Sequence, residues 1–229
     1  MTARLVRLGL LGGTFDPVHS GHVRAAVAVR SLLGLDRVML VPAAVPPHRA
    51  VQPRASAFHR FAMTAMAVQN EAGLEVSDLE LLGSGPSYTA TTLSALHAKG
   101  FAPSQLFFIT GADAFAEIAT WWRYPALLDA AHFVVVSRPG HGHDDLCERA
   151  PAVRPRIVDL RGRGPLADAI PPGPSVIFVD APTPDVSSTA IRQRLSTGLP
   201  ISDLVPFEVA RHIERHHLYR PPDGGSPLA

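Results

Sequence analysis

The sequence predicts an α/β protein built on a doubly wound, mostly parallel sheet. Short apolar runs alternate along the chain with segments of helical periodicity, and Gly or Pro bounds most of the runs. Continuously apolar strands are buried on both faces, as in a parallel sheet that is covered by helices on its two sides. Crossovers between such strands are expected to be right-handed.

Six apolar runs are predicted strands. The first ends at a glycine pair, the second is stopped by Pro42, and the fourth again runs into a glycine before a helical segment. In chain order the predicted strands are LVRLGLL (5–11), RVMLVPA (37–43), LEVSDLE (74–80), QLFFITGAD (105–113), HFVVVSRPG (132–140) and SVIFVDAP (175–182).

Five segments are predicted helices because their apolar residues recur at helical spacing. The second of them shows this most clearly, with Phe58, Phe61, Ala62, Ala65 and Met66 on one stripe. The predicted helices cover 22–35, 56–70, 89–99, 187–196 and 206–217, and the last two form a small C-terminal helical part.

Composition indicates a globular protein without a general affinity for polyanions. Hydrophobic residues make up 46% of the 229 residues, charged residues 18%, and the formal net charge is +1. The single cysteine, Cys147, cannot form an internal disulfide, which fits the reducing cytoplasm. No signal peptide or membrane-spanning run is predicted, and the sequence leaves a homo-oligomer open.

No break in composition divides the chain, so we expect one domain over residues 1–220. Within it, 139–174 is rich in Pro, Gly and Arg and is expected to be irregular. The tail 221–229 is expected to be disordered.

The stretch GGTFDPVHSGH (12–22) joins the first strand to the first helix. Ligands bind beyond the carboxyl ends of strands in an open parallel sheet, and Gly12 and Gly13 let the main chain approach one closely. His19 and His22 share a face at a helix N-terminus, where anions are favoured, so the segment predicts a polyphosphate site. An isolated His-x-x-His pair is more often a cap and a core histidine; the glycines and the Asp-Pro turn argue against that here.

A second candidate phosphate site lies in SSTAIRQRL (187–195). Ser187 or Ser188 can cap the helix, and Arg192 leans back toward the same end. Taken alone, the motif is as well explained by a capped amphipathic helix with a solvated arginine. GxxxxGK and GxGxxG do not occur, so neither a P-loop nor an ordinary dinucleotide site is predicted.

Together these motifs resemble the (T/H)xGH nucleotidyltransferases, and the finer pattern is similar to bacterial nicotinate mononucleotide adenylyltransferases. The resemblance covers about residues 5–220. It departs at Thr110, where an aliphatic residue is usual, and at Val186, which replaces an isoleucine. Besides the two motifs above, it rests in chain order on VPPHR (45–49), GPSYTATTL (85–93), FITGADAF (108–115), TWWRYP (120–125), SRPG (137–140) and HHLYR (216–220).

The resemblance implies a Rossmann-like nucleotidyltransferase fold and transfer of AMP from ATP to nicotinate mononucleotide in NAD biosynthesis. His19 and His22 would be the catalytic residues, stabilising charge on the transferring phosphoryl group. Mg²⁺ would be carried by the ATP phosphates without a dedicated protein cage. The residues implied for ATP binding are Gly12, Gly13, Thr14, Phe15, His19, His22, Gly111, Asp113, Arg138, Ser187, Ser188 and Arg192. Asp113 is equally well explained as a helix-starting cap.

The acceptor would be bound by His48, Arg49, Tyr88, Thr89 and Trp121. Trp121 would stack on the pyridine ring, and His48 and Arg49 would take the mononucleotide phosphate. Without the resemblance, a core tryptophan and a solvated loop arginine would be the ordinary readings. Around the ring site the sequence offers hydroxyls and loop N–H groups but no obvious Asp or Glu, which predicts a preference for nicotinate over nicotinamide mononucleotide.

Two other functions stay open: adenylyl transfer to another phosphorylated acceptor, and a non-catalytic nucleotide-binding regulator. No metal site is expected at HGHDD (141–145) or at His212, His216 and His217, because HExxH and cysteine clusters are missing. No nucleic-acid partner is expected from the arginines between 149 and 163, which lack interleaved aromatic residues.

Overall fold

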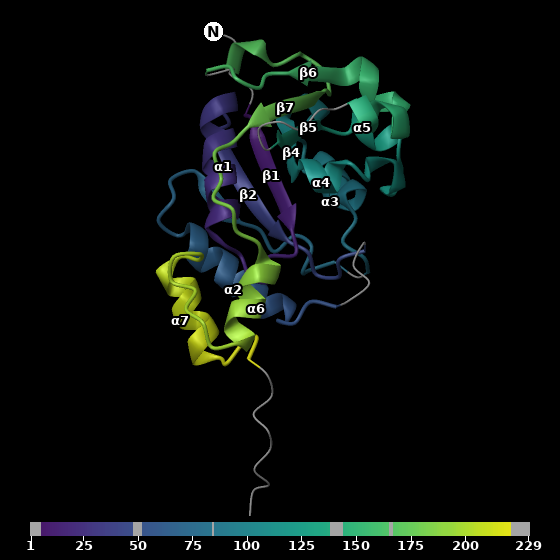
Figure 1. The fold of residues 1–229 in the computed structure, drawn as a ribbon. Coiled ribbons are helices and arrows are strands. Elements are labelled where there is room, and N and C mark those ends of the chain that lie inside the picture. The colour runs from purple at the N-terminus through teal and green to yellow at the C-terminus, as the bar shows by residue number, and fades with distance from the viewer. Residues whose placement is uncertain (1–5, 48–51, 84, 138–143, 165–166, 221–229) are drawn as a thin grey trace, which may run out of the picture.

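The computed structural model describes residues 6–47, 52–83, 85–137, 144–164 and 167–220. They form a sheet of seven strands in the order β3-β2-β1-β4-β5-β7-β6, and every pairing is parallel (Figure 1). The strands are β1 (Leu8–Gly13), β2 (Arg37–Pro42), β3 (Leu74–Val76), β4 (Leu106–Gly111), β5 (His132–Ser137), β6 (Ile157–Asp159) and β7 (Val176–Asp180). The predicted doubly wound parallel sheet is confirmed.

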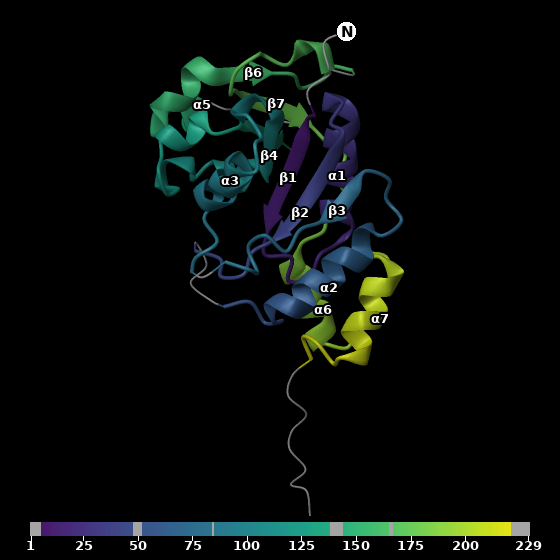
Figure 2. The same cartoon turned by 180° about the vertical axis from the view of Figure 1, so that it is seen from behind.

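The helices cover both faces of this sheet (Figures 1 and 2). They are α1 (Ser20–Leu33), α2 (Ala57–Val68), α3 (Thr89–Ala98), α4 (Ala112–Phe115), α5 (Asp144–Arg149), α6 (Ser188–Ser196) and α7 (Phe207–Arg215). No helix of the described residues is both long and apolar enough to cross a membrane.

Successive side chains of β1 point to opposite faces of the sheet and so belong to two separate cores. Leu11 and Ile109 join the core beneath α1, α2, α6 and α7, which includes Val29, Met63 and Ile213. The neighbouring Leu10 points to the other face, into the core beneath α3. Both faces of the strands are therefore buried, which explains why they are apolar at every position.

The chain reverses its direction of travel across the sheet between β1 and β4. From β1 it proceeds outward through β2 to β3, and from β4 it proceeds the other way through β5 and β7. The loops that follow the neighbouring strands β1 and β4 therefore lead in opposite directions and leave a crevice between them. Open α/β sheets bind their ligands at such a topological switch point.

The segment 139–174 is more regular than expected. Its described residues contain α5, a 3₁₀ stretch over Pro151–Arg156 and β6, which pairs with the edge of β7. The apolar part of β6, Ile157 and Val158, is too short to show a period, and neighbouring β7 supplies the pairing. The predicted strand 74–80 is also shorter, ending at Val76. Residues 221–229 lie outside the described residues.

Candidate active site

The loop after β1 folds back on its own aromatic residue. Phe15 is buried and adopts a left-handed main-chain conformation with φ of 49°. A Cβ on Gly13 would lie 2.9 Å from the Phe15 ring, so only glycine fits there. Gly13 and Phe15 thus shape the loop, and the ring of Phe15 meets that of His22 edge-on at 5.0 Å.

Asp16 holds this loop to the rest of the molecule. Its buried carboxylate accepts from the main-chain N–H groups of Arg54 at 2.9 Å and Ala55 at 3.1 Å. The hydroxyl of Tyr219 donates to the same carboxylate at 2.8 Å, from 203 residues further along the chain. Burial and the charge of Asp16 raise the pKa of Tyr219, so its hydroxyl stays protonated and remains a donor.

His19 and His22 lie stacked at the start of α1, with ring centroids 3.7 Å apart. The main-chain N–H of His19 donates to Nδ1 of His22 at 3.2 Å. Neutral His22 must then carry its proton on Nε2, which leaves that nitrogen as a donor. A Cβ on Gly21 would come within 3.0 Å of Nδ1 of His19, so the glycine between the histidines makes room for the first ring.

Both imidazoles are neutral in the free protein at neutral pH. Burial lowers the pKa of His19 to about 4. Burial, with the charge of His19 as a second cause, holds the pKa of His22 well below its usual value. They therefore offer hydrogen bonds rather than fixed positive charge, and an arriving polyphosphate would favour their protonation.

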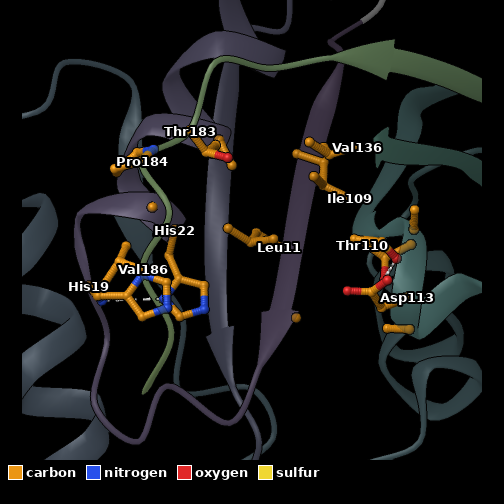
Figure 3. Close-up of a pocket in the computed structure, with 16 residues that line it drawn as sticks. Leu11, His19, His22, Ile109, Thr110, Asp113, Val136, Thr183, Pro184 and Val186 are labelled. Carbon is orange, nitrogen blue, oxygen red and sulfur yellow. Dashed lines mark hydrogen bonds between the residues drawn. The ribbon is translucent and has the colours of Figure 1, made fainter. Parts of the chain in front are cut away.

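A cavity of about 380 Å³ opens between these histidines and the end of β4 (Figure 3). Figure 3 shows His19 and His22 on one side, Thr110 and Asp113 on the other, and Leu11 between them. A Cβ built on Gly111 meets no atom within 4 Å, so the glycine leaves space that a ligand can occupy. The histidines, Gly111 and Asp113 are thus brought together as predicted.

The N-terminus of α6 lies against the loop that carries Asp16. Ser188 donates to the carbonyl of Pro17 at 2.8 Å, and Arg192 donates to the carbonyl of Asp16 at 2.7 Å. Ser187 caps the helix by accepting from the N–H of Ala190 at 3.1 Å. In this conformation the three side chains contact protein groups, while the preceding Pro184 and Val186 line the larger cavity.

A second cavity of about 240 Å³ adjoins the first, because Gly12, Thr110 and Ala114 line both. The described acceptor candidates Tyr88, Thr89 and Trp121 all line this smaller cavity. Gly13 and Thr14 line it too, rather than the larger one.

The two neighbouring tryptophans differ in their surroundings. Trp121 packs edge-on against Phe108, with ring centroids 5.9 Å apart, and against the core residue Phe133 at 6.5 Å. Trp122 is 44% exposed and lies 5.2 Å from the ring of Tyr88. Both line the smaller cavity and give it aromatic surface.

His48 and Arg49, expected at the phosphate of the acceptor, and Arg138, expected at a phosphate or the adenine of ATP, lie outside the described residues. In the part of the chain that is described, no three His, Cys, Asp or Glu side chains are grouped as metal ligands. His212 and His216 pack instead against His59 of α2, whose Nδ1 lies 3.0 Å from Nε2 of His212.

Sequence reasoning missed Arg60. This buried guanidinium donates to the carbonyls of Thr14 at 2.8 Å, Ala43 at 2.6 Å, Ala44 at 3.2 Å and Ala55 at 3.2 Å. It thereby ties the loops after β1 and β2 together beneath the smaller cavity. The predicted apolar stripe of helix 56–70 is not the buried face of α2: Phe58 is 80% exposed, and the helix buries Arg60, Met63, Thr64 and Ala67 instead. A buried face that contains an arginine and a threonine gives no apolar periodicity, so the sequence carried no clear signal for Arg60.

The expectation of no Asp or Glu near the acceptor ring was wrong. Glu80 lines the smaller cavity, together with Thr89 and Trp121. It lies in the connection before the GPSYT segment, and only the tertiary fold brings it to the cavity. Tyr219 was likewise noticed only as part of HHLYR, without its contact to Asp16.

Comparison with known proteins agrees with this geometry. The family model described as cytidylyltransferase-like matches residues 10–194. A probable nicotinate-nucleotide adenylyltransferase from Desulfatibacillum aliphaticivorans is 41% identical over 218 residues, covering 93% of this chain and all of the relative. A protein of the same description from Pseudomonas aeruginosa PAO1 is 43% identical over 219 residues, covering 94% of this chain and 98% of the relative.

The fold is also found in a solved structure. Plasmodium falciparum nicotinic acid mononucleotide adenylyltransferase complexed with NaAD superposes with a TM-score of 0.67 at 17% identity. The match covers 93% of this chain and 97% of the other, which supports the fold rather than individual roles. With the close relatives above, these findings place the chain in the nicotinate-nucleotide adenylyltransferase family, enzymes that transfer AMP from ATP to nicotinate mononucleotide in NAD biosynthesis.

Proposed function

We propose that this chain carries out AMP transfer across its two adjoining cavities, with ATP in the larger and nicotinate mononucleotide in the smaller. The shared lining by Gly12, Thr110 and Ala114 is the observation that carries this division. An acceptor phosphate must reach the α-phosphorus of ATP in line with the leaving pyrophosphate, and only the junction of the two cavities lets the substrates meet. We call the smaller cavity the acceptor pocket below.

His19 and His22 are proposed to stabilise the transferring phosphoryl group. They face the larger cavity, and His22 presents Nε2–H because its Nδ1 is already occupied. No covalent intermediate is needed: the acceptor oxygen forms the new P–O bond as the bond to pyrophosphate breaks. Donors fixed before the reaction lower the barrier without having to reorganise during it.

Gly12, Phe15, Gly111 and Asp113 are proposed to shape the adenosine and α-phosphate part of the site, with Gly13 and Thr14 closer to the acceptor. Asp113 is suited to accept from a ribose hydroxyl. Ser187, Ser188 and Arg192 are proposed to hold the pyrophosphate, which requires Arg192 to turn from the Asp16 carbonyl toward the cavity. His48 and Arg49 are proposed to bind the mononucleotide phosphate, and Arg138 to reach a phosphate or the adenine of ATP.

Mg²⁺ is proposed to be held mainly by the ATP phosphates. Among the described residues that line the larger cavity, Asp113 is the only carboxylate. This donor set suits an ion that keeps most of its waters and binds through its substrate. When bound, the ion neutralises phosphate charge during transfer.

The acceptor pocket is proposed to prefer nicotinate over nicotinamide mononucleotide. The hydroxyl of Thr89 and the first main-chain N–H groups of α3 are donors that satisfy a carboxylate, whereas an amide adds donors of its own. Each mismatch costs about 1–3 kcal/mol. Trp121 and Tyr88 offer aromatic faces to the ring. We further propose a cytoplasmic enzyme that acts on these small molecules and needs no nucleic-acid partner; a homo-oligomer remains open.

A pyrophosphate-release assay with a panel of acceptors tests the function. ATP with nicotinate mononucleotide should release pyrophosphate, and kcat/KM for nicotinamide mononucleotide should be about tenfold or more lower. Trp121→Ala and Thr89→Ala should raise the KM of the acceptor. No pyrophosphate from any acceptor would refute the activity, and equal efficiencies would refute the preference.

A further inference from the structure

Glu80 places a carboxylate in the pocket that must receive an anion. It is half-buried in the connection between β3 and α3, and it is the only acidic side chain among the described residues lining the acceptor pocket. A free carboxylate there would repel both the phosphate and the ring carboxylate of the acceptor. Its presence therefore calls for a role other than contact with the substrate.

The carboxylate of Glu80 is already bound by a protein hydroxyl. Thr92, buried in α3, donates to Oε1 at 2.6 Å. Ser87 lines the same cavity as Glu80. Burial raises the pKa of Glu80, and these two hydroxyls oppose that rise by stabilising the charged form.

The second of these hydroxyls joins the two segments that wall the acceptor pocket. The Ser87 oxygen accepts from the main-chain N–H of Ala44 at 2.9 Å and of Val45 at 3.3 Å. The N–H of Ser87 in turn donates to the carbonyl of Val45 at 2.9 Å. A serine hydroxyl has one proton and two lone pairs. With both lone pairs used by N–H groups, its proton needs a separate acceptor, and the carboxylate of Glu80, which lines the same cavity and whose pKa Ser87 lowers, can serve as that acceptor.

We infer that Glu80 is a positioning residue for the acceptor: through Ser87 and Thr92 it fixes residues 44–47 and 87–89 against each other and against α3. Pro46 and Pro47 come directly after Ala44 and Val45, and Tyr88 and Thr89 come directly after Ser87. One carboxylate therefore orders both segments that wall the pocket. The inference rests on the proposed assignment of this cavity to nicotinate mononucleotide.

Substitution of Glu80 by glutamine is a test because a positioning role and a merely repelling charge predict opposite changes in the KM of nicotinate mononucleotide. The amide keeps the shape and removes the charge, but its NH₂ group cannot accept from a hydroxyl, so Ser87 or Thr92 loses its acceptor. Positioning predicts that Glu80→Gln raises the KM of nicotinate mononucleotide about tenfold and leaves the KM of ATP unchanged. If Glu80 acts only as a repelling charge, the same variant lowers the acceptor KM.

Asp78→Asn is the matched control, because it removes the same charge from an exposed side chain two residues away that does not line the pocket. Its acceptor KM should stay at the wild-type value. Ser87→Ala and Thr92→Val should each raise the acceptor KM less than Glu80→Gln does. In the double variant Glu80→Gln/Ser87→Ala the effects should not add, because both break one link.

Steady-state kinetics with each substrate varied in turn, alongside thermal melts, tests the positioning role. If Glu80→Gln melts early, Ser87→Ala and Thr92→Val carry the same test. An acceptor KM that is unchanged or lower in these variants overturns the positioning role. If Trp121→Ala also leaves the acceptor KM unchanged, the assignment of the pocket has failed as well.

Discussion

A single main-chain contact decides which nitrogen of His22 carries the proton that can point into the larger cavity. Because Nδ1 accepts the N–H of His19, the neutral ring presents Nε2–H toward the cavity. Burial keeps the pKa of both imidazoles low, so neither carries a charge that water would have to screen before ATP arrives. At this scale the site is a pair of prearranged donors beside a glycine-lined space.

His22→Ala should lower kcat about 100-fold or more, the scale of losing one prearranged donor to a transition state. The dissociation constant of ATP should change much less, because the contact matters most when charge shifts during transfer. Single-turnover rates and an ATP titration measure the two effects. His59→Ala, a histidine that lines neither cavity, is the control, and a near-normal rate in His22→Ala would make that residue structural.

Gly111→Ala should leave the fold intact and weaken ATP binding. The main chain there has φ of −74°, which any residue adopts, and the new methyl group meets no protein atom within 4 Å. It would occupy space that the proposal gives to the nucleotide, and such overpacking costs about 1–3 kcal/mol, or about tenfold or more in affinity. Gly164→Ala also enters open space but lies in neither cavity lining, so an equal loss in both variants would argue against the assignment.

At the scale of elements, the parallel strands carry chemistry at one end and apolar packing at the other. The carboxyl ends of β1 and β4 lie at the cavities, whereas β5 begins, with His132, at the opposite end of the strands. That imidazole is fully buried and stacks on Phe107 at 4.7 Å. Neither of its nitrogens makes a hydrogen bond of acceptable geometry.

His132 should make the free energy of unfolding fall as the pH falls. Burial lowers its pKa to about 4, although the nearby main chain of Ser104 opposes this. Because the unfolded chain takes up a proton near pH 6.5 and the folded one only near 4, stability is full above about 6.5 and is lost between those values. From pH 7.5 to pH 5 the loss from this group is about 2 kcal/mol, taking its folded pKa as about 4.

Urea unfolding of wild type and His132→Leu at both pH values measures this contribution. The variant replaces the titrating ring with an apolar side chain of similar size. Its free energy of unfolding should therefore fall about 2 kcal/mol less over this pH range than that of wild type. His19 and His22 remain in both proteins and cancel in the comparison. An equal fall in both proteins would show that His132 does not titrate this way.

At the scale of the whole molecule, the C-terminal helices complete the loop at the start of the chain. α6 donates to the carbonyls of Asp16 and Pro17 through Arg192 and Ser188, and Tyr219, after α7, donates to the Asp16 carboxylate. α7 itself packs against α2, next to the segment whose N–H groups bind Asp16. Both ends of the described chain therefore converge on one buried carboxylate.

Tyr219→Phe should lower stability by about 1–3 kcal/mol, because it leaves a buried carboxylate with one donor fewer. We also expect a lower kcat, since the loop before His19 loses one of its fixed points. Chemical unfolding and pyrophosphate release measure the two effects. Tyr124→Phe is the control: the Tyr124 hydroxyl is buried without a hydrogen-bond partner, so its removal should be neutral or stabilising. Equal behaviour of the two variants would contradict the role given to Tyr219.

Much of this protein is determined by local sequence. The apolar runs predict the parallel sheet because strands buried on both faces must be apolar throughout. β6 was not predicted because its two apolar residues stand in a segment rich in Pro and Arg, without the longer run that marked β3. The pairing of His19 with His22, and the open space at Gly111, follow from spacing along one strand and one helix, so short motifs reveal them. These features depend on contacts between near neighbours in the chain.

Only the tertiary structure decided the roles of Arg60, Glu80 and Tyr219. Each is an unremarkable polar residue in its own segment, and each acts on main-chain groups or side chains that folding brings to it. Arg60 reaches carbonyls after two different strands, Glu80 binds hydroxyls of the segment that walls the acceptor pocket, and Tyr219 meets Asp16 across 203 positions. A buried polar group needs a partner wherever the fold supplies one, and the choice of that partner is made by three-dimensional packing rather than by spacing in the chain.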